Sequence, residues 1–93
     1  MFATAENNIY VKAINEIIEK LIAAQIPFTV NPVFKGLQLR FPWHYGDVAC
    51  HEGTYSSDQG LVESYQFPWD DDDVTVATPK LMADLIIDLY SGN

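Results

Sequence analysis

Near the start of the chain, apolar residues recur at the three- and four-residue spacing of an amphipathic helix. The positions between them are charged or polar, so we predict a helix over about 8–25 with one side facing a core. Pro27 pushes the residue before it out of helical geometry, and we expect the helix to end there. The apolar face comprises Tyr10, Ile14, Ile17, Ile18, Leu21 and Ile22.

The middle of the chain, residues 28–76, alternates apolar and polar side chains with the two-residue period of β-strands. A strand that begins at Phe28 contains Pro32, which indicates that the strand lies at the sheet edge or contains a bulge. Lys35-Gly36 is typical of a tight turn. Further strands are expected over 37–41, around 48–50, over 61–67 and, as a short fifth, over 74–76, with a hairpin turn at 56–60.

A second helix is predicted over 79–90, because Thr78 is a good N-cap and Pro79 suits the first helical position. We expect its apolar face to be formed by Leu81, Met82, Leu85, Ile86 and Leu89. The predicted class is therefore α+β: an N-terminal helix, a four- to five-stranded, mainly antiparallel sheet and a C-terminal helix, with both helices on one face. Residues 1–93 are expected to form a single domain.

The composition fits a globular protein, since 48% of the residues are hydrophobic. The lone cysteine, Cys50, excludes an internal disulfide and suits a reducing compartment. No apolar run approaches the roughly 18–20 residues of a membrane helix, and residues 1–6 lack the basic and apolar regions of a secretory signal. We therefore expect a cytoplasmic protein that does not bind membranes.

Negative charge is concentrated in the second half of the chain. Residues 1–40 have a net charge of +1, whereas residues 41–93 carry ten acidic residues and only Lys80, a net charge of −9. Such a field repels DNA, RNA and anionic lipid, and it attracts basic protein surfaces or cations. Direct binding of nucleic acid is not expected.

An internal repeat lies within the acidic half. F-P-W-H-Y-G-D-V at 41–48 recurs as F-P-W-D-D-D-D-V at 67–74, 26 positions later, and the two copies contain both tryptophans of the chain. We call these the FPW segments. Each could anchor a strand end in the core, or could form an exposed binding patch in which aromatic rings attract cations. We expect one tryptophan in the core and the other partly exposed.

The four aspartates of the second FPW segment suggest either a solvated acidic loop or a docking surface for Lys and Arg. Calcium loops place oxygens at alternate positions around a glycine, a pattern that residues 70–73 lack. We therefore predict no dedicated metal site. The predicted partner-binding residues are Trp43, Tyr45, Asp47, Glu63, Trp69, Asp70, Asp71, Asp72 and Asp73.

Motifs for catalysis or cofactor binding are absent from the sequence. Cys50, His44 and His51 show no C-x-x-C or H-x-x-x-H spacing, and neighbours on a strand face opposite sides, so Cys50 and His51 form no dyad. Cys50 is expected to be a buried structural residue. We predict no cofactor and no enzymatic activity.

These observations favour a non-enzymatic acidic protein that docks on a basic surface of a partner protein. The expected surface is one with which that partner binds nucleic acid. In size, charge and element order the chain resembles the small acidic inhibitors of phages and mobile elements, including anti-CRISPR and anti-restriction DNA mimics, although it shares no motif with them. One alternative is a structural protein that self-associates, for example as a homodimer, through its sheet edge or FPW patch. Another is a small metal-binding protein or enzyme that uses residues 70–73.

Overall fold

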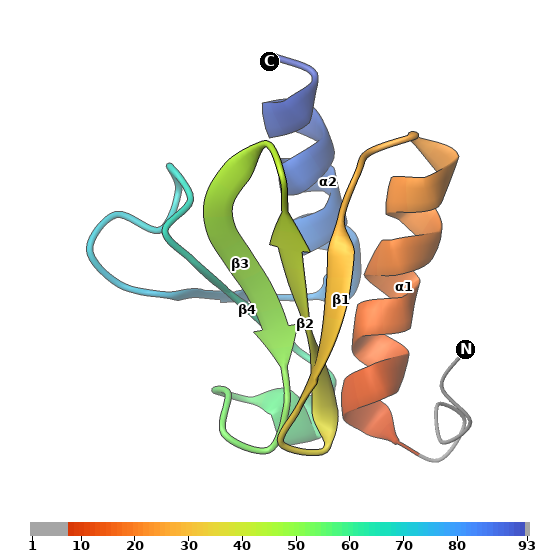
Figure 1. The fold of residues 1–93 in the computed structure, drawn as a ribbon. Helices are drawn as coiled ribbons and strands as arrows, with labels where there is room; N and C mark the ends of the chain where they lie inside the picture. Colours follow the sequence, from red (N-terminus) through yellow and green to blue (C-terminus); the bar gives the residue numbers. More distant parts are fainter. Residues whose placement is uncertain (1–7, 93) are drawn as a thin grey trace.

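The computed structural model of the chain describes residues 8–92. Residues 1–6, in which no secretory signal is expected, lie outside the described residues. The elements follow the predicted order of helix, strands and helix (Figure 1). They are α1 (Ile9–Ala23), β1 (Thr29–Val33), β2 (Gly36–Phe41), β3 (His44–Cys50), the 3-10 turn η2 (Ser57–Gln59), β4 (Val62–Tyr65), β5 (Thr75–Ala77) and α2 (Pro79–Tyr90).

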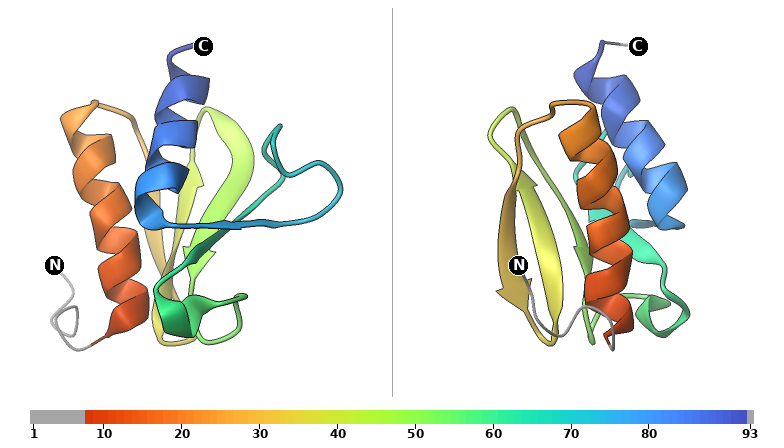
Figure 2. Two further views of the ribbon diagram at one scale, coloured as in Figure 1. Left: turned by 180° about the vertical axis from the view of Figure 1, so that it is seen from behind. Right: turned by 90° about the vertical axis from the view of Figure 1, so that its right-hand side faces the viewer.

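The five strands form one antiparallel sheet in which each strand pairs with its neighbours in sequence, in the order β1-β2-β3-β4-β5. Both helices cover the same face of this sheet (Figure 2). The α+β class and this arrangement are confirmed. β1 is an edge strand, which is one of the two alternatives that Pro32 indicated.

The first helix begins as predicted and ends at Ala23, two residues before the predicted end at 25. The Asn8 side chain accepts hydrogen bonds from the backbone N–H groups of residues 10 and 11 and so caps the N-terminus. At the other end Gln25 has a left-handed φ of 60°, and the Ile26 N–H donates to the Leu21 carbonyl at 2.9 Å. Ile26 is buried, so a Schellman motif with its apolar contact ends the helix at Ala23.

The turn between β1 and β2 is shifted by one residue from the prediction. Phe34 and Lys35 form it, with φ values of 37° and 69°. Gly36 begins β2, and a Cβ there would lie 1.9 Å from the Cys50 carbonyl oxygen. This glycine is therefore required because two backbones approach closely, rather than because of the turn.

The second helix matches the predicted bounds, and Thr78 Oγ1 accepts a hydrogen bond from the Leu81 N–H at 3.2 Å. Leu81 itself is exposed, contrary to the expected apolar face, because the helix packs through Met82, Ala83 and Ile86. Within residues 8–92, neither helix is long and apolar enough to cross a membrane.

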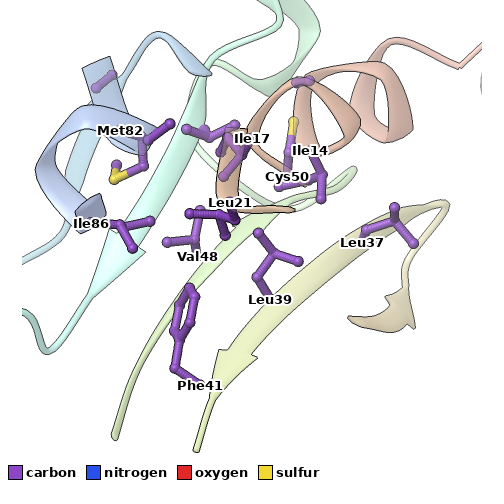
Figure 3. Close-up of a cluster of buried hydrophobic side chains, with 14 of the residues drawn as sticks. Ile14, Ile17, Leu21, Leu37, Leu39, Phe41, Val48, Cys50, Met82 and Ile86 are labelled. Carbon is purple, nitrogen blue, oxygen red and sulfur yellow. The ribbon is translucent and has the colours of Figure 1, made fainter. Parts of the chain in front are cut away.

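The core lies between the sheet and the two helices (Figure 3). Leu39 of β2 and Val48 of β3 are paired in register and face α1, and Met82 of α2 completes the cluster. Burying a side chain of this size contributes about 1.5–3 kcal/mol relative to exposure. Further fully buried members are Ile14, Ile17, Leu21, Leu37, Cys50, Val62 and Ile86.

Candidate functional site

The two FPW segments meet at one end of the sheet. The first spans the turn between β2 and β3, and the second lies in the connection between β4 and β5. Since β2 and β4 both run antiparallel to β3, the connections that follow them leave the sheet at the same end (Figure 1). Segments 26 positions apart in sequence therefore become neighbours in space.

Four rings from the two segments form a continuous stack. Tyr45 lies against His44, His44 against Phe67 and Phe67 against Trp69, with centroid separations of 4.8, 4.7 and 4.7 Å and interplanar angles of 15°, 14° and 5°. The Gly46 N–H donates to His44 Nδ1 at 2.9 Å and fixes the imidazole. A Cβ on Gly46 would lie 2.9 Å from the Phe67 ring, so the stack requires a glycine here.

Both tryptophans are half-buried, so the expected partly exposed ring is found, whereas the expected fully buried core ring is not. Trp43 donates through Nε1 to the Pro27 carbonyl at 3.0 Å, and its ring lies 5.0 Å from that of Tyr90. Trp69 donates through Nε1 to Ser64 Oγ at 2.9 Å. Their contacts within the chain tie the FPW turns to the rest of the fold.

Asp70 faces inward, and we therefore remove it from the predicted surface. It is only 4% exposed, and its carboxylate accepts hydrogen bonds from Ser64 Oγ at 2.7 Å and from the Phe67 N–H at 3.0 Å. The cause is Ser64, which is fully buried on the core face of β4 and needs a polar partner. Asp70 provides that partner, while the three aspartates that follow it remain exposed.

Between the FPW turns lies a surface recess of about 340 Å³, which we call the FPW recess. Among its walls are Tyr45 and Tyr65, which are 74% and 49% exposed, and the exposed residues Asp71 and Asp72. The remaining lining residues are His44, Gln66, Phe67 and Pro68, so none of the residues lining the recess is a lysine or arginine. The structure thus brings together three of the predicted residues, Tyr45, Asp71 and Asp72.

Asp47 and Glu63 lie outside this recess, around a second depression of about 300 Å³ on the sheet face opposite the helices. We call this depression the sheet hollow. Tyr65 lines both the hollow and the recess, so the two are contiguous. Asp73 is exposed, and its carboxylate accepts a hydrogen bond from the Val74 N–H at 2.8 Å.

His44 and Tyr65 line the FPW recess but were missing from the predicted partner-binding residues. Tyr65 could have been found, because it lies two residues from Glu63 and a strand places such residues on one face. His44 belongs to the first FPW segment, but its position in the stack depends on contact with the second segment.

Cys50 is buried, as predicted, and its Sγ donates to the Leu61 carbonyl at 3.3 Å. Burial raises the pKa of this thiol to about 11, which keeps it protonated and unreactive near neutral pH. His51 Nδ1 accepts a hydrogen bond from the Gly53 N–H at 3.0 Å. Within residues 8–92, no group of three or more His, Cys, Asp and Glu side chains is placed to hold a metal ion.

A larger, mainly apolar groove of about 790 Å³ lies between the N-terminal end of α1 and the turn that joins β1 to β2. Ile9 and Phe34 are its exposed apolar members. None of the predicted partner-binding residues lines it.

Comparison of the chain with protein-family models, characterised proteins and solved structures finds no match. The geometry and charge of its own residues are therefore the basis for a functional proposal.

Proposed function

We propose that this protein is a non-enzymatic binding protein that docks through the FPW recess on a basic surface of a partner protein. The observation that supports the proposal is the lining of the recess, in which exposed tyrosine rings stand beside exposed carboxylates. A Lys or Arg side chain would gain cation–π attraction from the rings and a charge-assisted hydrogen bond from Asp71 or Asp72.

The net charge of −8 supports the same mode of action. A single-sign field accelerates encounter with an oppositely charged surface and disfavours approach to phosphate groups. Surfaces that bind nucleic acid are rich in Lys and Arg, so an acidic protein seated on one occupies the place of the phosphates. The proposed consequence is inhibition of a nucleic-acid-binding partner by occlusion, as in DNA-mimic inhibitors of the anti-defence type.

Affinity capture from the native host tests this proposal. The protein is immobilised as wild type, as the Asp71→Asn/Asp72→Asn variant and as a control, Glu16→Gln/Glu19→Gln, which removes equal charge from exposed positions on α1. Changing residues 70–73 together would be less informative, because Asp70 is part of the core. Bound proteins are eluted with a salt gradient in one set of samples and challenged with duplex DNA or RNA in a parallel set.

We expect wild type and control to retain a basic partner that nucleic acid displaces. The Asp71/Asp72 variant should bind that partner at least about tenfold more weakly at physiological salt, a loss of roughly 1.4 kcal/mol. This difference should shrink as salt rises, because screening weakens exposed charges. Equal retention by all three proteins would contradict the proposal. A homo-oligomer that persists at high salt would favour self-association instead.

A further inference from the structure

The sheet face opposite the helices is open and displays a charged hollow. Alternation along the strands places Gln38, Asp47, Ala49, Glu63 and Tyr65 on this face. In register, Asp47 pairs with Tyr65 and Ala49 pairs with Glu63, so the two acids are diagonal neighbours across β3 and β4. Ala49, whose side chain is short, lies beside both acids in the lining of the sheet hollow.

The carboxylates of Asp47 and Glu63 are each held by a hydrogen bond, but neither forms a salt bridge within residues 8–92. Gln38 Nε2 donates to Asp47 Oδ2, and the Tyr55 N–H donates to Glu63 Oε2 at 3.2 Å. Within residues 8–92, no hydrogen bond engages the second oxygen of either carboxylate, and no salt bridge involves either group. Each acid therefore keeps an acceptor oxygen for a ligand.

Among residues 8–92, Arg40 is the one basic side chain that the strand register places on this part of the face. It is exposed and pairs in register with Asp47, but no ion pair joins them within the described residues. His51 also lines the hollow. Two carboxylates thus face the hollow with one arginine beside them, and the electrostatic balance favours a cationic occupant.

We propose that the sheet hollow binds an arginine side chain of an extended basic segment, whose next basic residue enters the FPW recess. The inference rests on the proposed function and adds the chemistry and shape of the partner. A guanidinium is planar, stacks on aromatic rings and donates in several directions, so it can contact Tyr65 while it pairs with Asp47 and Glu63. Lysine offers a point charge without the stacking plane.

Tyr65 lines both the sheet hollow and the FPW recess, and this position favours an extended segment as the occupant. Tyr65 separates the hollow from the recess, and its side chain stands two residues along β4 from that of Glu63. Side chains two residues apart on an extended chain are about 7 Å apart and point to the same side. A peptide with arginine at every second position can therefore address both depressions.

Calorimetric titration with three synthetic peptides tests the inference. Each alternates glycine with arginine, with lysine or with citrulline, which keeps the planar shape of arginine but has no charge. At about 0.01 M ionic strength, where screening is weak, we expect the arginine peptide to bind at least about threefold more tightly than the lysine peptide. The citrulline peptide should bind at least about tenfold more weakly than the arginine peptide.

Two variants with opposite expected effects locate the site. Glu63→Gln keeps an oxygen for the Tyr55 N–H but removes the charge, and should weaken binding of the arginine peptide at least about fivefold. Arg40→Gln removes the competing cation and should tighten binding about two- to threefold. Misfolding cannot account for tighter binding, so this second variant remains informative if Glu63→Gln is unstable. Glu16→Gln on α1 is the matched single-charge control.

The outcomes separate this inference from the proposed function. If both Glu63→Gln and Arg40→Gln bind the arginine peptide as wild type does, or if the lysine peptide binds equally well, the hollow is not an arginine site. In that case a loss of binding in the Asp71→Asn/Asp72→Asn variant would leave the proposed function standing. If wild type binds none of the charged peptides, the sheet hollow is not an arginine site, and affinity capture from the native host decides the proposed function separately.

Discussion

Asp70 and Asp71 are adjacent and identical in chemistry, but their environments predict opposite responses to the change from aspartate to asparagine. The Asp70 carboxylate accepts two hydrogen bonds in the core, and Ser64 Oγ, which donates one of them, itself accepts from Trp69. Asparagine keeps one acceptor oxygen, so one of these charge-assisted bonds is lost. Such a bond contributes about 1.5–3 kcal/mol, and a buried donor left without a partner costs a similar amount.

We therefore expect Asp70→Asn to lower the free energy of unfolding by about 2–3 kcal/mol. For a domain of this size this corresponds to a fall of about 10–20 °C in Tm. Asp71→Asn is the control: the side chain is exposed, its φ is 56°, and asparagine tolerates this left-handed conformation well. Its effect should stay within about 0.5 kcal/mol.

Urea unfolding followed by tryptophan fluorescence and by circular dichroism measures both variants. Combining Asp70→Asn with Ser64→Ala provides a further check, because residues in one hydrogen-bond network give non-additive losses, with coupling of about 1 kcal/mol or more. If Asp70→Asn and Asp71→Asn unfold at the same urea concentration, the buried network does not stabilise the fold.

Three further changes test other parts of the structure. The pKa of the Cys50 thiol is about 11 in the folded protein, against an ordinary value of 9.0. The unfolded chain therefore loses this proton at a lower pH than the folded protein does, and the free energy of unfolding should fall by about 2–3 kcal/mol between pH 9 and pH 11. Alkaline unfolding of Cys50→Ala should lack that component, and an identical pH dependence in the two proteins would contradict the assignment. Gly46→Ala should displace Phe67, change the fluorescence of the stacked tryptophan and destabilise the fold by about 1–3 kcal/mol. Gly53→Ala should have a smaller effect, because its Cβ would lie 3.2 Å from the ring of the half-buried His51, which can shift. Phe34→Asn should raise the free energy of unfolding by about 0.5–1 kcal/mol, and Tm with it, because asparagine suits the positive φ of this turn. An unchanged or lower Tm would show that contacts of the Phe34 ring offset its backbone strain.

The elements that could be predicted from the sequence are those whose signals are local. Thr78 and Pro79 mark the start of α2, and the two-residue alternation in 37–41 marks β2, because each signal depends only on residues close in sequence. The early end of α1 is also local, but its signal is a glutamine in left-handed conformation rather than the usual glycine. Pro27 was the stronger sequence signal for the end of the helix, and it placed that end about two residues too late.

The burial of Asp70 depends on tertiary structure and could not be predicted from the aspartate run alone. Within the run, four identical residues look equally exposed, and only the inward-facing Ser64 on β4 selects one of them. Alternation along 61–67 does not by itself show that Ser64 faces inward, and the identity of its partner depends on how the following loop turns back. The positive φ values of Gln66 and Asp71, on either side of Asp70, accompany that turn.

The strictly sequential strand order has a consequence for how the chain folds. Each strand pairs with its neighbours in sequence, so the hairpins close short loops and lose little entropy when they form. Packing of α1 on α2 is different, because about 55 residues separate the two helices and closing that loop costs about 2–3 kcal/mol more than closing a tight hairpin. Low contact order within the sheet favours fast folding. The barrier should therefore be set mainly by the step that brings the terminal helices together over a sheet that has already begun to form.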